Sequence, residues 1–171
     1  MQNHFELFGL APTFALEAEA LERSYRDIQS KVHPDRFAHA GDAERRASLQ
    51  WTTRVNEAYR TLKDPLQRAK HLLELRGVDV AFETNTAMPA DFLVQQMALR
   101  ELLEEAVQTK DAAALDTLRK NLAGEKGALE RRIGESIDAN NDYAGAAGLV
   151  RKLMFLDKLD TEIGCAYEAL E

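Results

Sequence analysis

Several residue types are scarce in this 171-residue sequence, and each shortage narrows what the chain can form. A single cysteine, Cys165, excludes an internal disulfide and a Cys-x-x-Cys zinc clip, which fits a reducing compartment. No stretch approaches the roughly 18 consecutive apolar residues of a membrane span. Residues 1–7 lack a basic segment followed by an apolar run, so nothing there marks the chain for export. We therefore expect a cytoplasmic protein that has no membrane partner.

Clustered positive charge is missing as well. Residues 1–76 carry 12 Lys and Arg against 11 Asp and Glu, whereas residues 77–171 carry 10 against 18. Nucleic-acid binding needs clustered Lys and Arg for phosphate contacts, so we expect no nucleic-acid partner. The 45% of hydrophobic residues is enough for a packed core in one domain or in two small ones.

The tripeptide His33-Pro34-Asp35 is the most informative local feature that the sequence does have. Pro34 fixes φ and lacks an N–H, so a helix that approaches from the N-terminal side should end at about Val32 or His33. An imidazole and a carboxylate then lie two positions apart on an exposed corner. Exposed loops of this kind often carry function, so the tripeptide predicts a contact surface for a partner.

Helical patterns flank this corner on both sides. The first helix begins near Glu17, and its apolar positions recur at helical spacing to form a predicted buried face of Leu21, Tyr25, Ile28 and Val32. Arg23 and Arg26 fall on the opposite, exposed side. After the corner a second helix is predicted from Gly41-Asp42 to about Lys63. Asp64-Pro65 then starts a third helix, which closes at Arg76-Gly77 with Leu66, Ala69, Leu72 and Leu73 buried.

The run from Val55 to Pro65, VNEAYRTLKDP, and its spacing from the tripeptide resemble a J-domain over roughly residues 4–76. In that domain two antiparallel helices flank an exposed His-Pro-Asp loop that docks on a DnaK-type ATPase chaperone. Two positions depart from the family pattern. Val32 stands where an aromatic residue is usual, and Asp27 interrupts a face that is often wholly basic.

The rest of the chain predicts a linker at residues 77–90 and a second domain at 91–171. The linker is polar and irregular, with breakers at residues 84–86 and Pro89. Three helices follow at about residues 91–108, 111–139 and 142–170, separated by short polar breaks that make neighbours antiparallel. Their predicted inward positions are Leu115, Leu118, Leu122, Leu129 and Ile133, then Leu149, Leu153, Leu156, Ile163, Tyr167 and Leu170. No strand pattern is present, so the predicted fold is all-α: a J-domain followed by a three-helix bundle.

The helix at residues 91–108 has two apolar stripes. One stripe comprises Phe92, Leu99, Leu103, Ala106 and Val107, and the other comprises Leu93, Val94 and Met97, on the same side as Glu101, Glu104 and Glu105. One face of a bundle cannot bury both stripes, so the second should be partly exposed and serve as a binding surface. Phe155 lies off the apolar stripe of the last helix, which suggests that Met97 and Phe155 face one partner together. The alternative is that an inter-domain contact covers the second stripe, or that this helix is central.

The segments DFLVQQMALRELLEE (91–105) and VRKLMFLDKL (150–159) narrow the resemblance to the HscB family of J-proteins in iron–sulfur cluster assembly, over essentially the whole chain. The resemblance implies a co-chaperone that activates a partner ATPase, is no enzyme itself and needs no cofactor. It implies that an HscA-type chaperone is bound by His33, Pro34, Asp35, Arg23, Arg26 and Lys31. It implies that the scaffold protein IscU is bound by Leu93, Val94, Met97, Glu101, Glu105 and Phe155. Gln95 and Ala98 stand where acidic residues are common in the family, so charge should contribute less to scaffold binding here than in relatives that carry those acids.

Alternatives from other classes stay open at the level of sequence. One is a J-protein that delivers other or unfolded clients to DnaK. Another is a metal-dependent enzyme, because His33, Asp35, His39 and Asp42 crowd one loop and offer N and O ligands. A corner between two helices offers no pocket that excludes water, which argues against catalysis. Cys165 as a nucleophile is weaker still, because it lies within a long predicted helix without an oxyanion-hole signal.

Overall fold

The computed structural model describes residues 2–80 and 88–171, and these residues contain helices and no strand. The chain divides into two compact units, Met1–Leu72 and Leu73–Glu171. The predicted linker at residues 77–90 includes residues 81–87, which lie outside the described residues. The domain limits 1–76 and 91–171 therefore stay predictions. No helix in the described part of the chain is long and apolar enough to cross a membrane.

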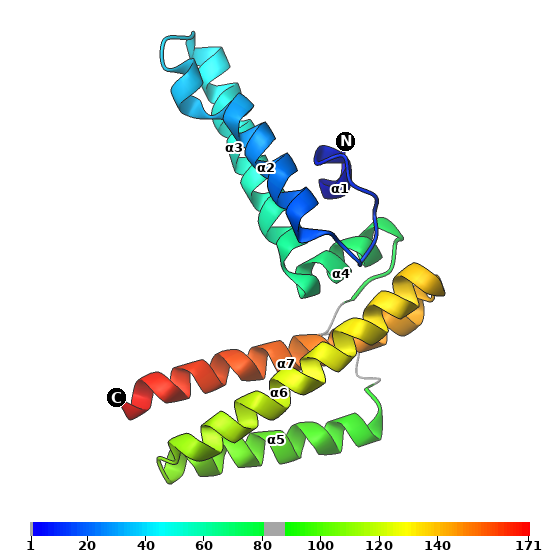
Figure 1. Ribbon diagram of the computed structural model, residues 1–171. Helices are drawn as coiled ribbons and strands as arrows, with labels where there is room; N and C mark the ends of the chain where they lie inside the picture. Colours follow the sequence, from blue (N-terminus) through cyan, green and yellow to red (C-terminus); the bar gives the residue numbers. More distant parts are fainter. Residues whose placement is uncertain (1, 81–87) are drawn as a thin grey trace. The chain divides into compact units, whose positions relative to one another are not determined.

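Unit 1 is built on a hairpin of two long helices (Figure 1). Its elements are α1 (His4–Leu7), α2 (Ala18–Val32), the 3₁₀ turn η1 (Pro34–Phe37), α3 (Asp42–Lys63) and most of α4 (Pro65–Leu75). The boundary between the units falls within α4, after Leu72. The helix boundaries follow the predicted signals, because Pro34 ends α2 and the Asp64 carboxylate accepts a hydrogen bond from the Leu66 amide at 3.2 Å to start α4. Gly77, with φ of 72°, supplies the left-handed residue after α4.

The core of unit 1 lies along α3, which contacts both α2 and α1. Phe5, Leu21, Val55, Ala58 and Leu62 are buried there. Of the four residues predicted to form the buried face of α2, only Leu21 is buried. Tyr25, Ile28 and Val32 are half-buried. These three residues lie toward the loop, where α2 has only α3 as its partner, and two helices alone cannot enclose a side chain on all sides.

Unit 2 contains a three-helix bundle whose boundaries match the predicted ones closely. Its helices are α5 (Ala90–Gln108), α6 (Ala112–Gly134), the π-helical turn η2 (Glu135–Ala139) and α7 (Tyr143–Leu170). Each pair among α5, α6 and α7 is in contact. Asp111 and Asp142 cap α6 and α7 by accepting hydrogen bonds from the amides of Ala114 and Gly145. The two tight turns are reached through left-handed conformations at Lys110 and Asn141.

The bundle core confirms most of the predicted inward residues. All five named positions of α6 are buried, as are Leu149, Leu153, Leu156 and Ile163 of α7. Tyr167 is half-buried and donates a hydrogen bond to Asp116, which joins the two longest helices. Of the predicted inward stripe of α5, Phe92, Leu103 and Ala106 are buried and Leu99 is half-buried, whereas Val107 was predicted wrongly because it is 44% exposed. It lies in the last turn of α5, next to the polar break that leads into α6.

Candidate functional site

The loop at the end of the α2–α3 hairpin holds the first set of predicted site residues. His33 follows the last residue of α2, and its amide donates to the Gln29 carbonyl at 3.0 Å. Pro34 then occupies the first position of η1, where its missing N–H costs no hydrogen bond. The chain therefore turns sharply at His33 and presents the loop outward.

The His33 and Asp35 side chains are exposed, to 46% and 91%. The Asp35 amide donates to Nδ1 of His33 at 3.2 Å. A neutral imidazole that accepts at Nδ1 carries its proton on Nε2. The loop thus offers a partner an N–H donor from His33 and a carboxylate from Asp35, side by side and with the imidazole orientation set by the backbone.

Two hydroxyl groups on α3, which are not among the site residues predicted from the sequence, hold the base of this loop. Ser48 donates to the Val32 carbonyl at 2.6 Å. The single proton of the Thr52 hydroxyl lies between two acceptors, the same Val32 oxygen at 3.2 Å and the Ser48 carbonyl at 2.9 Å. Ser48 is a buried polar residue, so its bond is shielded from water. The only sequence signal is a pair of hydroxyl residues four positions apart on one face of α3. The carbonyl that they satisfy is one of those left open at the C-terminus of α2.

The basic residues predicted to bind a chaperone are each paired with an acid one turn earlier on α2. Arg26 lies 3.0 Å from Glu22, and Lys31 lies 3.0 Å from Asp27. Arg23 is 4.0 Å from Glu19. Asp27, which departs from the family pattern, is thus the partner of Lys31. Exposed pairs of this kind contribute little to stability, so they hold the cations in place without binding them strongly.

A polar and aromatic network joins this face of α2 to α3. The Tyr25 and Tyr59 rings stack with centroids 4.0 Å apart, and the Tyr25 hydroxyl donates to Asn56 at 2.7 Å. Tyr59 donates to the Glu22 carboxylate at 2.6 Å. This hydrogen bond lowers the pKa of Glu22, and the nearby Arg26 guanidinium acts in the same direction. The same bond raises the pKa of Tyr59. Asn56 and Tyr59 of the run at 55–65 therefore fix the two helices to each other.

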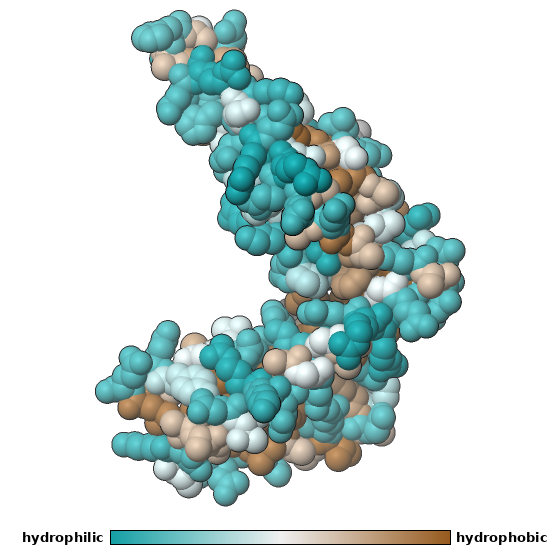
Figure 2. All heavy atoms as spheres, in the orientation of Figure 1, coloured by the Kyte–Doolittle hydropathy of each residue, from teal (hydrophilic) through white to brown (hydrophobic). Residues whose placement is uncertain are grey.

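The second set of predicted site residues lies on α5. We call Leu93, Val94, Met97, Glu101 and Glu105 the α5 face. Leu93, Val94 and Met97 are 44%, 67% and 65% exposed, which confirms the prediction that this stripe is not buried. Figure 2 shows apolar surface among hydrophilic residues along the edge that α5 forms. Glu101 and Glu105 are exposed too, so the face combines apolar contact area with negative charge.

Phe155 does not belong to this exposed surface, which corrects the sequence-based expectation. Its side chain is only 6% exposed and packs edge-on against Phe92, with ring centroids 5.8 Å apart. The Arg100 guanidinium lies over the Phe155 ring at 5.6 Å and also pairs with Glu162 at 2.8 Å. Phe155 therefore joins α7 to α5 inside the bundle, and it does not share a free surface with Met97.

The two positions that depart from the family pattern differ in their surroundings. Gln95 is half-buried, and its amide donates to the Glu125 carboxylate of α6 at 2.8 Å. An acid at position 95 would face Glu125, so Gln95 is part of the packing between α5 and α6. Ala98 is exposed on the side of Val94, where it leaves the α5 face less acidic.

The residues of the alternative sites lie on the loop after α2, at the start of α3 and on α7. His39 and Asp42 are exposed near His33 and Asp35. Among the described residues, no group of three or more His, Cys, Asp or Glu is arranged to hold a metal ion. Cys165 is exposed on α7 as a free thiol.

Comparisons with known proteins point to a single family. Residues 88–164 match the family model described as the HSCB C-terminal oligomerisation domain. A protein of Burkholderia multivorans, named co-chaperone protein HscB homolog, is 52% identical over 169 residues, which cover 99% of this chain and 96% of that protein. The homolog from Burkholderia cenocepacia is 51% identical over the same lengths.

Solved structures show the same fold. The chaperone HscB from Vibrio cholerae superposes with a TM-score of 0.86 at 35% identity, covering 99% of this chain and 100% of that one. The human co-chaperone HscB superposes with a TM-score of 0.91 at 25% identity, covering 96% of this chain and 82% of that one. The all-α arrangement predicted from the sequence is therefore confirmed.

Proposed function

Because the chain belongs to the HscB co-chaperone family of iron–sulfur cluster assembly, we propose that it activates the ATPase of an HscA-type chaperone and delivers the scaffold protein IscU to it. The His-Pro-Asp loop serves the first task and the α5 face the second. A reducing cytoplasm, in keeping with the single Cys165, is the proposed compartment.

The observation that carries the proposal is the construction of the loop. Asp35 and the imidazole of His33 are exposed, yet the turn that bears them is fixed by Pro34 and by the hydroxyls of Ser48 and Thr52. Exposed side chains on a fixed backbone bind with a small loss of conformational freedom. Arg23, Arg26 and Lys31 continue this surface along α2 and provide cations for acidic groups of the chaperone.

The α5 face supplies the second contact in this proposal. Leu93, Val94 and Met97 place a continuous apolar surface on one side of a rigid helix, and Glu101 and Glu105 extend it with negative charge. Such a surface suits a folded partner with an apolar patch and nearby cations. Phe155 supports this surface from within the bundle, because it packs under α5 against Phe92.

The first prediction tests the loop directly. His33→Gln should abolish stimulation of the HscA ATPase, because it removes the exposed imidazole. The melting temperature should hardly change, since exposed side chains contribute within about 0.5 kcal/mol to stability. The measurement is steady-state ATP turnover by HscA with each variant, beside a thermal melt.

His39→Gln is the matched control, because His39 is an exposed histidine six residues away and outside the tripeptide. It should stimulate like the unmodified protein. Full stimulation by His33→Gln would refute the docking assignment. Stimulation of DnaK with an unfolded client, but not of HscA with IscU, would favour the general J-protein function instead.

A further inference from the structure

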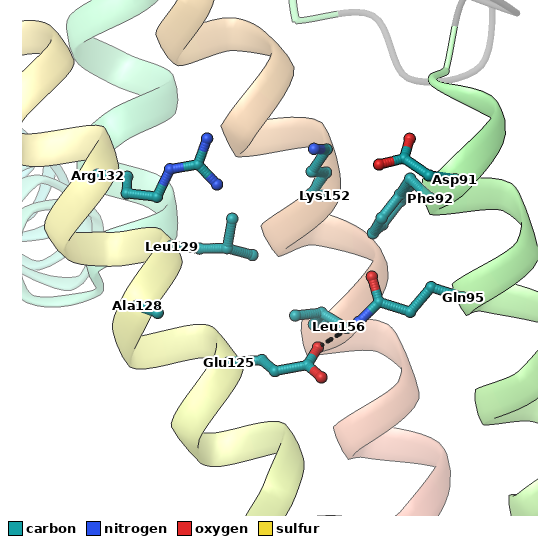
Figure 3. A pocket seen from close by; sticks show the side chains of 9 residues that line it. All are labelled: Asp91, Phe92, Gln95, Glu125, Ala128, Leu129, Arg132, Lys152 and Leu156. Atoms are coloured by element: carbon teal, nitrogen blue, oxygen red, sulfur yellow. Dashed lines mark hydrogen bonds between the residues drawn. The ribbon is translucent and has the colours of Figure 1, made fainter.

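A pocket between the three helices of the bundle has no part in the function proposed above. Its volume is about 230 Å³. Figure 3 shows the lining side chains, which come from α5, α6 and α7. They are Asp91, Phe92, Gln95, Glu125, Ala128, Leu129, Arg132, Lys152 and Leu156. None of the α5 face residues is among them, so the pocket lies on another side of α5.

The apolar part of the pocket is built from core residues. Phe92, Leu129 and Leu156 are buried, and Ala128 is half-buried beside them. A small residue at position 128 leaves room that a larger side chain on α6 would fill. This apolar surface favours a ligand with a hydrocarbon part, since covering it removes apolar area from water.

Two cations at the pocket, Arg132 and Lys152, have no carboxylate partner within the described part of the chain. The Lys152 ammonium lies over the Phe92 ring, 5.5 Å from its centroid, and the Arg132 guanidinium makes no hydrogen bond within the residues that the structure describes. Some other cations of the same bundle are paired, Arg119 with Asp160 and Lys126 with Asp157. An apolar pocket with two unpaired cations is suited to an anion, because charge-assisted hydrogen bonds are the strong ones.

The acids at the pocket limit how much negative charge it accepts. Glu125 already receives a hydrogen bond from Gln95 at 2.8 Å, drawn as the dashed line in Figure 3. Asp91 lies in the first turn of α5, where the helix dipole favours a negative charge. Both carboxylates would repel a polyanion such as a phosphate ester. A ligand with a single negative charge avoids most of that repulsion.

We propose that this pocket binds a single carboxylate attached to a small apolar body. The carboxylate pairs with Arg132 and Lys152, and the hydrocarbon part covers Phe92, Leu129 and Leu156. The volume lies below the roughly 300–1,000 Å³ of typical ligand pockets, so the body is small. Two sources share this chemistry: a free monocarboxylic acid, and the C-terminal carboxylate of a peptide that ends in an apolar residue.

Calorimetric titration of the full chain, supported by amide chemical-shift mapping, tests the proposal. The probes are hexanoate, for a free acid, and N-acetyl-Gly-Gly-Leu with a free C-terminus, for a peptide. Each has a neutral counterpart, hexanamide and the C-terminally amidated peptide. At least one of the two carboxylates should bind, at least tenfold more tightly than its amide, with shifts in α5, α6 and α7 around the pocket. Which one binds more tightly identifies the source.

Variants locate the contact. Arg132→Gln combined with Lys152→Gln should weaken carboxylate binding at least tenfold, while Arg131→Gln, an exposed neighbour that does not line the pocket, should leave it unchanged. Ala128→Leu should block binding by filling the pocket, with circular dichroism confirming that the helices persist. Equal affinity for acid and amide, equal affinity for inorganic phosphate, unchanged binding in the double variant, or no binding of either carboxylate would each overturn the proposal.

Discussion

At the scale of single residues, the loop depends on a carbonyl group that is not part of the tripeptide. The Val32 oxygen accepts hydrogen bonds from Ser48 and Thr52, and this ties the end of α2 to α3. The loop position is thus determined by residues 16 and 20 positions after Val32 in the sequence. A change on α3 should therefore affect the loop even though it leaves the exposed side chains intact.

The second prediction follows from this. Ser48→Ala should lower the free energy of unfolding of unit 1 by about 1 kcal/mol, because it removes a partly buried hydrogen bond and leaves the Val32 carbonyl with only the longer contact to Thr52. Urea unfolding monitored by circular dichroism measures the change. Thr53→Ala is the control, since the Thr53 hydroxyl bonds only to Leu49 on its own exposed helix face. An equal loss of unfolding free energy in both variants would show that the hydrogen bond to Val32 contributes no more to stability than the bond from Thr53 to Leu49.

The third prediction concerns the Tyr59–Glu22 hydrogen bond. Tyr59→Phe should raise the pKa of Glu22 toward its usual range, because it removes the main group that stabilises the carboxylate. In the unmodified protein the folded-state pKa lies below the unfolded one, so the stabilisation is present at neutral pH and is lost as the pH falls through the folded-state pKa. The variant should therefore lose less stability on acidification. Carboxyl chemical shifts of Glu22 against pH provide the measurement, and an unchanged titration would contradict this role of Tyr59.

At the scale of helices, the sequence predicts where helices begin and end, but it does not predict which sides of α7 are buried. The helix boundaries were predictable, because Pro34, Asp64-Pro65 and Gly77 act through local backbone geometry. The position of Phe155 was not. A helical stripe shows which residues share a side of α7, but α7 contacts both α6 and α5 and so buries two sides. Likewise the buried role of Ser48 depends on a carbonyl from another helix, which no periodicity within α3 reports.

The fourth prediction separates the two kinds of apolar residue near α5. Phe155→Ala should lower the free energy of unfolding of the bundle by roughly 3–5 kcal/mol, because it leaves a cavity beneath Phe92 and Arg100. Met97→Ala should change it by no more than about 0.5 kcal/mol, since Met97 is exposed. Denaturant unfolding of the two variants compares them directly.

Binding gives the converse comparison. On the proposed function, Met97→Ala should weaken IscU binding at least tenfold, as expected for an apolar anchor at an interface. Calorimetric titration against IscU measures this in a variant that the melt shows to be folded. Unchanged affinity would remove Met97 from the proposed contact, and a large loss of stability in Met97→Ala would show that the residue is structural.

At the scale of the whole molecule, the order of the parts could be predicted and the contacts of the binding surfaces could not. A hairpin with an exposed loop followed by a three-helix bundle is already present in the helical pattern and the spacing of Pro and Gly residues. The acid excess is concentrated in residues 77–171. This agrees with two surfaces of different charge, one with paired cations on α2 and one with exposed acids on α5.

The fifth prediction is that the two activities can be separated by cutting the chain. A fragment of residues 1–76 should still stimulate the HscA ATPase, because the loop, both flanking helices and the hydroxyls that hold the loop lie within it. The further stimulation that IscU gives should be lost, since the α5 face is absent. ATP turnover with and without IscU measures both effects. An IscU effect that survives in the fragment would place the scaffold contact elsewhere.

On the proposed function, the ion pairs along α2 make docking an exchange of ionic partners. When an acidic group on a chaperone takes Arg26, Glu22 loses its cation, but the hydroxyl of Tyr59 still donates to it. Glu22 therefore does not become a bare charge at the edge of the contact. The hydrogen bond from Tyr59 therefore lowers the free-energy cost of separating Arg26 from Glu22. Tyr59 lies on α3, the helix that also holds the loop.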